Sequence, residues 1–561
     1  MNKTGAEIVI ECLIKEKVEI LFGIPGGVLL PIFDVLYDAP FKFILTRHEQ
    51  GAAHMADGYA RATGKVGVCI ATSGPGATNL ATGLATAYMD SIPMVAITGQ
   101  VASQLVGNDA FQEADTTGVT RSITKHNFMV RNIKELAPTI AKAFYIARTG
   151  RQGPVVVDIP TDITKQSCEF IYPENVKMRS YNPVYKGHPQ QIQKVIELIK
   201  KSRAPVVYAG GGIISSGASK EFSTFVDKLG IPVTLTLLGL GAYPADSELF
   251  LGMLGMHGTY YANHAIQNSD LIIAIGARFD DRITGKVDEF APKAAIVHID
   301  IDPTSIGKNI KTDLPIVGDA KEVLQELNKL IAKEKIKLNL QDWYNTINKW
   351  KKDSPLIYKH DDKLRPQYVI EKIHEVTGGK AIIATEVGQN QMWTAQFFKF
   401  SYPRQLLTSG GLGTMGYGFP AAIGARFGMP DKVVFNIAGD GSIQMNIQEL
   451  ATAVYNKVPV KVAILNNGCL GMVRQWQELF FNKRYSGVNL KCANPDFVKL
   501  AEAYGAVGIR ITKKKEVVPA LKKALTTENV VFLDFQVEQE ENVWPMVPSG
   551  KPLHEILRGL A

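Results

Sequence analysis

Two oxygen-bearing side chains, Asp440 and Asn467, follow neighbouring apolar runs of the sequence and could hold a metal ion together. Asp440 lies in the turn 439–441, Gly-Asp-Gly, which precedes a helical pattern. A glycine turn that opens a helix exposes backbone N–H groups and attracts phosphate. Mg²⁺ prefers oxygen ligands and often bridges them to phosphate. Each residue alone is an ordinary turn residue, but the pair at this spacing predicts a metal-held diphosphate.

Glu49 follows a short strand-like segment and opens a helix of small residues, 49–60. A carboxylate in the first turn of a helix usually does no more than stabilise the helix N-terminus. The small apolar neighbours indicate a packed helix start, where a carboxyl could have a raised pKa and relay protons. His48 and His54 have no further ligands at a useful spacing, so the sequence does not favour a metal site there.

The glycine-rich segment 409–418 contains the pattern G-x-G-x-x-G. A dinucleotide-binding turn of this type needs an acidic residue about 20 residues further on for the ribose. The segment 427–430, Phe-Gly-Met-Pro, stands there instead. We interpret the segment as a loop that lines a cofactor, with Met415 as its apolar side chain.

Short apolar runs rich in Val and Ile recur along the chain, with helical patterns between them. Such a pattern predicts an α/β fold whose parallel sheets are covered on both faces. Polar stretches at 168–189 and 338–366 look like linkers and divide the chain into three doubly wound parallel-sheet domains, 1–165, 190–335 and 365–540, with a tail at 541–561. The runs are 66–71, 94–98, 155–159, 206–209, 271–275, 296–299, 382–385, 433–437, 462–465 and 531–535.

The first and third domains also echo each other. The tetrapeptide Leu-Ala-Thr-Ala occurs at 84–87 and again at 450–453, and a proline follows each copy at the same distance, Pro93 and Pro459. Each copy lies on an expected helix after a glycine-rich turn, and each proline opens the next expected strand. The shared context favours a common design over chance similarity.

The composition excludes several classes of function. The 561 residues include 62 basic and 54 acidic side chains, a net charge of +8 that is spread along the chain, with no aromatic-interleaved basic stripe for nucleic acid. The five scattered cysteines favour a reducing compartment, so we expect a cytoplasmic protein. No run predicts a signal peptide or a membrane span.

From 22–27, Phe-Gly-Ile-Pro-Gly-Gly, to 544–548, Trp-Pro-Met-Val-Pro, the chain resembles the catalytic subunits of the acetolactate (acetohydroxyacid) synthase family, which depend on thiamine diphosphate. The resemblance implies that Glu49 hydrogen-bonds the aminopyrimidine ring of thiamine diphosphate and favours its imino tautomer. Met415 would bend the cofactor so that its two rings meet. Asp440, Asn467 and the carbonyl of Cys469 would hold Mg²⁺.

The same resemblance implies binding sites for thiamine diphosphate in the first and third domains, which would bind its pyrimidine and its diphosphate, and for FAD in the central domain. The residues implied to contact thiamine diphosphate are Pro25, Gly26, Thr72, Asn79, Val387, Gly388, Gln389, Asn390, Gly413, Gly439, Asp440, Gly441, Ser442, Asn467 and Cys469. Those implied to contact FAD are Arg151, Gly211, Gly212, Met256, His257, Gly276, Arg278, Asp280, Arg282, Asp300, Asp302 and Asp319. From the residues alone, Gly210 to Gly212 form a reasonable phosphate turn, whereas 278–282 is an ordinary charged turn.

The implied reaction decarboxylates pyruvate and joins the remaining two-carbon unit to pyruvate or 2-ketobutyrate, at the start of branched-chain amino acid synthesis. Gln112, Met472 and Trp476 would lie at the reacting centre, although Trp476 by itself reads as a core aromatic residue. The implied partners are a second or further copies of the chain, with sites at their interface, and a small regulatory subunit.

Two kinds of alternative stay open. One is a different thiamine-dependent enzyme, either an oxidoreductase such as pyruvate oxidase or another 2-keto acid decarboxylase or carboligase. The other is a non-enzymatic nucleotide-binding protein on the same scaffold. Three positions depart from the family's usual residues: Ala102, Thr161 and Asn390 stand where Pro, Lys and His are common. These departures concern inhibitor sensitivity and pocket polarity rather than the core reaction.

Overall fold

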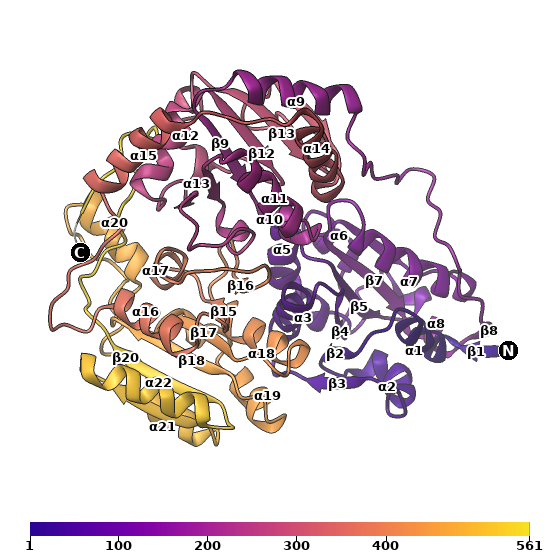
Figure 1. Ribbon diagram of the computed structural model, residues 1–561. Coiled ribbons are helices and arrows are strands. Elements are labelled where there is room, and N and C mark those ends of the chain that lie inside the picture. The colour runs from indigo at the N-terminus through magenta and orange to yellow at the C-terminus, as the bar shows by residue number, and fades with distance from the viewer. Residues whose placement is uncertain (560–561) are drawn as a thin grey trace.

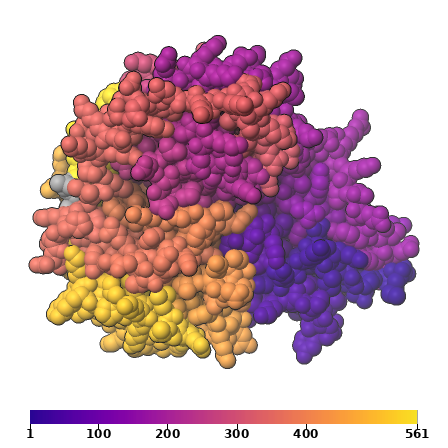
Figure 2. Space-filling view, viewed as in Figure 1, coloured from indigo at the N-terminus to yellow at the C-terminus, as the bar shows by residue number. Residues whose placement is uncertain are grey.

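The computed structural model describes residues 1–559 and contains three six-stranded parallel sheets, which confirms the predicted fold class (Figure 1). Every apolar run that the sequence singles out forms a strand. Figure 2 shows the indigo N-terminal part in contact with both the magenta central part and the orange C-terminal part. No helix among residues 1–559 is both long enough and apolar enough to cross a membrane.

The N-terminal sheet has the strand order β3-β2-β4-β5-β7-β6. The preceding amphipathic helix α1 (Gly5–Lys15) packs on α7 (Ile133–Arg148), as its buried apolar stripe requires. The strands are β2 (Ile20–Gly23), β3 (Lys42–Leu45), β4 (Gly67–Ala71), β5 (Met94–Gln100), β6 (His126–Met129) and β7 (Pro154–Pro160).

The C-terminal sheet has the order β16-β15-β17-β18-β20-β19, so its strands follow one another in space as those of the N-terminal sheet do. The two copies of Leu-Ala-Thr-Ala lie on corresponding helices, α5 (Ala81–Asp90) and α19 (Glu449–Tyr455). This agreement of sequence and topology supports a common design of the two domains. The strands are β15 (Ile382–Thr385), β16 (Leu406–Leu407), β17 (Val434–Gly439), β18 (Lys461–Asn466), β19 (Val507–Ile511) and β20 (Val531–Gln536).

Two corresponding helices, α3 (Glu49–Thr63) and α18 (Gly418–Gly428), pack directly against each other and join the N-terminal and C-terminal domains. Glycine permits this close approach. A Cβ atom on Gly58 would lie 2.1 Å from the carbonyl oxygen of Ala421, and one on Gly424 would lie 1.9 Å from that of Met55. Both contacts are with backbone, which has little room to move.

The central sheet has a different order, β11-β10-β9-β12-β13-β14, which reverses between β9 and β12. This is the order of the dinucleotide-binding doubly wound fold, whose ligands lie beyond the strand ends at the reversal. Three helices, α9 (Pro189–Lys201), α11 (Ser219–Leu229) and α14 (Ala320–Glu334), pack together beside the sheet. The strands are β9 (Pro205–Ala209), β10 (Val233–Leu235), β11 (Phe250–Met253), β12 (Leu271–Ile275), β13 (Ala295–Asp300) and β14 (Leu314–Val317).

The two expected linkers differ in structure. The first is mostly irregular, although β8 (Ser167–Glu169) pairs antiparallel with β1 (Asn2–Thr4). The second was wrongly interpreted as a linker throughout, because it contains helix α15 (Gln341–Asp353), which packs on α12 (Tyr260–Asn268). Trp343 and Ile347 of α15 are buried, and the indole N–H of Trp343 donates to the carbonyl of Pro205 at 3.1 Å. These two side chains, one helical turn apart, outweigh the lysines on the exposed face.

Candidate active site

The C-terminal sheet places Asp440 and Asn467 beside each other. Its strand order reverses between β15 and β17, and Gly439 at the end of β17 pairs with Leu465 of the neighbouring β18. Asp440 and Asn467 therefore follow the carboxyl ends of adjacent strands, where doubly wound sheets bind their ligands. A cavity opens at this edge, which we call the diphosphate cavity. Its lining comprises 387–390, Trp393, Met415, 439–442, Leu465, Asn467 and 469–473.

The expected metal ligands have the donor chemistry of a divalent cation site. The Asp440 side chain is buried, and burial raises its pKa to about 6, a cost that a bound cation would offset. One of its oxygens accepts a hydrogen bond of 2.6 Å from the Asn494 amide. The Asn467 amide oxygen accepts from the Cys469 N–H at 3.2 Å, and its amide nitrogen donates to Gln389 at 3.3 Å. A carboxylate, an amide oxygen and a main-chain carbonyl thus fit Mg²⁺.

Glu386, a residue that the sequence reasoning missed, holds the loop that carries Met415 through hydrogen bonds to main-chain N–H groups. Glu386 follows β15 directly and is fully buried. Its carboxylate accepts hydrogen bonds from the N–H groups of Gly416 at 2.7 Å and Phe419 at 2.9 Å. Burial raises the pKa of Glu386 to about 7. The sequence signal that could have identified Glu386 was its position directly before residues 387–390, which line the diphosphate cavity.

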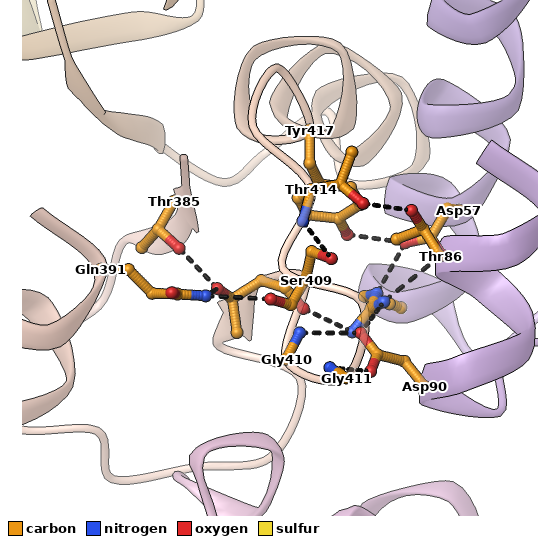
Figure 3. Close-up of polar contacts among 12 residues, drawn as sticks. Asp57, Thr86, Asp90, Thr385, Gln391, Ser409, Gly410, Gly411, Thr414 and Tyr417 are labelled. Carbon is orange, nitrogen blue, oxygen red and sulfur yellow. Dashed lines mark hydrogen bonds and ion pairs between the residues drawn. The ribbon is translucent and has the colours of Figure 1, made fainter. Parts of the chain in front are cut away.

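The same loop is held from the side by the N-terminal domain (Figure 3). The carboxylate of Asp90, at the end of α5, accepts hydrogen bonds from the N–H groups of Gly410 at 3.0 Å and Gly411 at 2.7 Å. Arg61 of α3 pairs with Asp90 at 2.8 Å and with Asp57 at 2.6 Å. These three side chains form a buried ion-pair cluster of the N-terminal domain at the domain boundary, which we call the interdomain cluster and in which each charge has a partner, as burial requires.

Two hydroxyl contacts complete this interdomain cluster. The Tyr417 hydroxyl donates to Asp57 at 2.6 Å, and the hydroxyls of Thr86 and Thr414 hydrogen-bond at 2.7 Å (Figure 3). Since Thr414 and Tyr417 flank Met415, the N-terminal domain fixes both sides of that residue. Gly413 of the loop lines the cavity next to the diphosphate cavity.

Glu49 and the expected pyrimidine contacts form a separate cluster at the corresponding edge of the N-terminal sheet. Glu49 is buried, and its carboxylate accepts a hydrogen bond of 2.9 Å from the Asn79 amide. Gly26, which follows Pro25, lies so close to Thr72 that a Cβ atom would come within 2.3 Å of that side chain. Within the described residues of one chain, none of this cluster lines the diphosphate cavity.

Gln112 stands apart from the other expected site residues. Its side chain is exposed, its backbone has a φ of 57°, and it lines neither the diphosphate cavity nor the two cavities of the central domain. A single chain therefore does not bring Gln112 to Met472 and Trp476.

The central sheet has a glycine-lined crevice at its reversal point. Gly210 and Gly276 follow β9 and β12, and a Cβ atom on Gly212 would lie 2.6 Å from the Cα of Gly276. Two adjoining cavities that share Gly211, Gly276 and Arg278 fill this crevice. All of the residues expected to contact FAD line it except Asp302: Arg151, Gly211, Gly212, Met256, His257, Gly276, Arg278, Asp280, Arg282, Asp300 and Asp319.

The acidic residues of the crevice have different partners. Asp302 pairs with Arg151 at 3.0 Å and so holds that side chain in place. Asp319 caps helix α14 by accepting from the N–H groups of residues 321 and 322. Asp300 is buried, and burial raises its pKa to about 6. Burial also lowers the pKa of His257 to about 4, so this imidazole is neutral near pH 7.

The crevice and the diphosphate cavity adjoin each other. Both are lined by Val387, Gly388, Met472 and Val473, and Trp476 lines the crevice on the same helix, α20 (Gly471–Phe480). Met472 thus lies where the two cavities meet, and Trp476 lies one helical turn further along the same helix. The side chains that they contribute there are apolar and half-buried.

Comparisons with known proteins find similarity along nearly the whole chain. Three thiamine pyrophosphate enzyme family models match: the N-terminal TPP binding domain at residues 3–119, the central domain at 192–327 and the C-terminal TPP binding domain at 386–535. An acetolactate synthase large subunit of Buchnera aphidicola subsp. Schizaphis graminum is 50% identical over 99% of this chain and 98% of its own length. That of Corynebacterium glutamicum is 50% identical over 99% and 90%, and the isozyme 3 large subunit of Escherichia coli is 47% identical over 99% and 98%.

Proposed function

The chain belongs to the acetolactate synthase large subunits, a family of thiamine pyrophosphate enzymes, and from that premise we propose that it makes 2-acetolactate from two molecules of pyruvate. With 2-ketobutyrate as acceptor the product is 2-aceto-2-hydroxybutyrate. Both products begin the synthesis of branched-chain amino acids. The observation that carries the proposal is that the cavity lined by Asp440 and Asn467 adjoins the crevice lined by Trp476, with Met472 lining both.

The diphosphate cavity supplies what thiamine diphosphate and Mg²⁺ need. Asp440, Asn467 and the Cys469 carbonyl would hold the metal, and the turn 439–442 would offer N–H groups to the diphosphate. Met415 would press on the cofactor from the loop that Glu386 and Asp90 hold. When bound, the thiazolium ring supplies the electron sink that allows CO₂ to leave a 2-keto acid. The chain's own contribution is to bind, orient and exclude water.

Glu49 would hold a proton opposite the aminopyrimidine ring. Its carboxylate is buried and is oriented by Asn79, so it is poised to exchange that proton with a ring nitrogen. Because its cluster lies outside the diphosphate cavity of its own chain, we propose that it serves the cavity of a second copy. Gln112, in the same domain, would reach Met472 and Trp476 of that copy in the same way.

The central crevice would bind FAD. Its strand order, its glycine cradle and its paired Arg151 fit a dinucleotide, whose pyrophosphate needs close approach to backbone. The proposed reaction has no net oxidation, so the flavin would act as part of the wall of the site. The relatives are named large subunits, and we propose that this chain also binds a smaller subunit with a regulatory role.

A direct assay tests the proposed function against the alternative of a pyruvate oxidase. The protein is incubated with pyruvate, Mg²⁺, thiamine diphosphate and FAD, and acetolactate is converted to acetoin by acid. We expect acetoin without hydrogen peroxide. Peroxide without acetolactate would contradict the proposal and favour the oxidase.

A further inference from the structure

Glu449, the first residue of α19, is a fully buried carboxylate that hydrogen-bonds across the domain boundary. One of its oxygens accepts from the N–H groups of both Arg47 and His48 at 3.0 Å, and the other accepts from Arg47 at 3.2 Å. The Thr452 hydroxyl donates to the second oxygen at 2.7 Å. The acceptor and the two N–H groups are about four hundred positions apart in the sequence.

The N-terminal domain makes room for this carboxylate. A Cβ atom on Gly51 would lie 2.4 Å from one of its oxygens. Arg47 and His48 precede helix α3, and His48 is its N-cap, so their N–H groups have no partners within the helix. A negative charge at this place is also favoured by the helix dipole. Burial raises the pKa of Glu449, and the hydrogen bonds that it accepts oppose that rise.

We propose that Glu449 is a positioning residue, which fixes the start of α3 and thereby the place of the Glu49 carboxyl. Glu49 directly follows His48, so a shift of the clamped segment moves Glu49 with it. The inference rests on the proposed function of Glu49. It also links the two sites along the chain. The diphosphate turn 439–442 leads through the short 3-10 helix Ser442–Asn446 to Glu449, the residue that places Glu49.

The corresponding helix of the N-terminal domain makes the reciprocal contact. Asp90, on α5, accepts from the N–H groups of Gly410 and Gly411, which precede α18. Each of these two domains thus uses a carboxylate on α5 or α19 to hold a segment that precedes the other domain's central helix, although Asp90 ends its helix and Glu449 begins its own.

The test compares Glu449→Ala with Glu449→Gln as matched control. Alanine removes the acceptor, whereas glutamine keeps one oxygen that can accept from both N–H groups. The first measurement is amide hydrogen exchange of the segment 45–50 in cofactor-free protein. Faster exchange is expected in Glu449→Ala only. Equal protection in wild type and Glu449→Ala would overturn the inference.

The second measurement is deuterium exchange at C2 of thiamine diphosphate bound to the Mg²⁺ holoenzyme. We expect Glu449→Ala to slow it roughly ten- to hundred-fold, because misplacement of a catalytic group by about 1 Å costs that much. Cofactor affinity should be unchanged, since the diphosphate cavity is intact, and Glu449→Gln should stay near wild type. Wild-type exchange in Glu449→Ala at full cofactor occupancy would overturn the inference.

A second variant covers the case in which Glu449→Ala does not fold. Gly51→Ala adds a good helix former and pushes the carboxylate away, so it should slow C2 exchange in the same way, and an unchanged rate would also overturn the inference. Glu49→Gln separates the two levels of the argument. If Glu49→Gln exchanges as fast as wild type, the proposed role of Glu49 fails. If only Glu449→Ala and Gly51→Ala match wild type, the positioning role alone fails.

Discussion

At the scale of single residues, two buried carboxyl groups at strand ends of the C-terminal sheet have different uses. Both Glu386 and Asp440 have pKa values raised by burial. Glu386 accepts main-chain hydrogen bonds with both of its oxygens and holds the Met415 loop. Asp440 instead lines the cavity, where we propose that it offers an oxygen to a cation. The same chemistry thus gives a scaffold residue in one place and a proposed metal ligand in the other.

Glu49→Gln should nearly abolish turnover and leave cofactor binding intact. The amide cannot exchange a proton with the aminopyrimidine ring, and loss of such a group costs roughly a hundred-fold or more in rate. The measurement is acetolactate formation beside titration of thiamine diphosphate in the presence of Mg²⁺. Turnover near that of wild type would refute the assigned role.

Glu386 should make the stability of the protein depend on pH. Burial raises the pKa of Glu386 from 4.5 to about 7, so the folded state holds its proton more tightly than the unfolded chain does. The resulting stabilisation is fully present below pH 4.5 and is lost as the pH rises through about 7. Between pH 5 and pH 8, chosen to span that range, this loss amounts to roughly 2–3 kcal/mol.

Glu386→Gln is the variant that checks this pH dependence. Its side chain is neutral throughout, so the thermal unfolding midpoint of wild type should fall more steeply from pH 5 to pH 8 than that of the variant. Circular dichroism measures both midpoints. Parallel curves would show that Glu386 does not titrate in this range.

The sequence predicted the residues that stand at strand ends, and the structure brings Asp440 next to Asn467 and Gly212 next to Gly276 at such ends. It did not predict Glu386, Asp90 or Glu449. Their hydrogen-bond partners are main-chain N–H groups, which carry no residue type, and for Asp90 and Glu449 these lie in another domain. Local patterns cannot reveal such contacts.

At the scale of elements, the close packing of α3 against α18 depends on glycines, which have no side chain to keep the two helices apart. Gly424→Ala would bring a Cβ atom within 1.9 Å of the Met55 carbonyl oxygen. We expect a loss of about 1–3 kcal/mol from overpacking, despite the better helix propensity of alanine. Gly27→Ala is the control, because its Cβ atom would meet nothing within 4 Å. Equal unfolding midpoints for the two variants would contradict the packing argument.

The central crevice gives a second prediction at this scale. Gly212→Ala would place a Cβ atom 2.6 Å from the Cα of Gly276 and so distort the glycine cradle. The variant should be purified without flavin and should lose acetolactate formation together with FAD binding. Absorbance spectra measure the flavin content. A full complement of FAD in this variant would place the dinucleotide elsewhere.

Strands were easier to predict than helices from the sequence. Buried parallel strands are continuous apolar runs, whereas α15 is mostly polar and buries only Trp343 and Ile347 fully, with Tyr344 and Trp350 partly buried against the core. Short strands such as β16 and partly exposed strands such as β19 lack the long, fully buried apolar run that would mark them in the sequence. Their place depends on the longer strands beside them.

At the scale of the whole molecule, two related domains flank a dinucleotide-type domain. The equal strand orders of the first and third sheets, and the contact of α3 with α18, give the chain an internal two-fold character. Glu49 and the diphosphate cavity belong to opposite halves of this arrangement. A symmetric pair of chains would therefore make two equivalent sites, each with Glu49 from one chain and Asp440 from the other.

Complementation between two inactive variants tests this central claim most directly. Glu49→Gln and Asp440→Ala are co-expressed with different tags, and acetolactate formation from pyruvate is measured on the purified mixture. Half of randomly formed dimers contain both variants, and each of these has one intact site in two. The account predicts about a quarter of wild-type activity from the mixture, although each variant alone is inactive. A mixture as inactive as its components would contradict a site shared between chains.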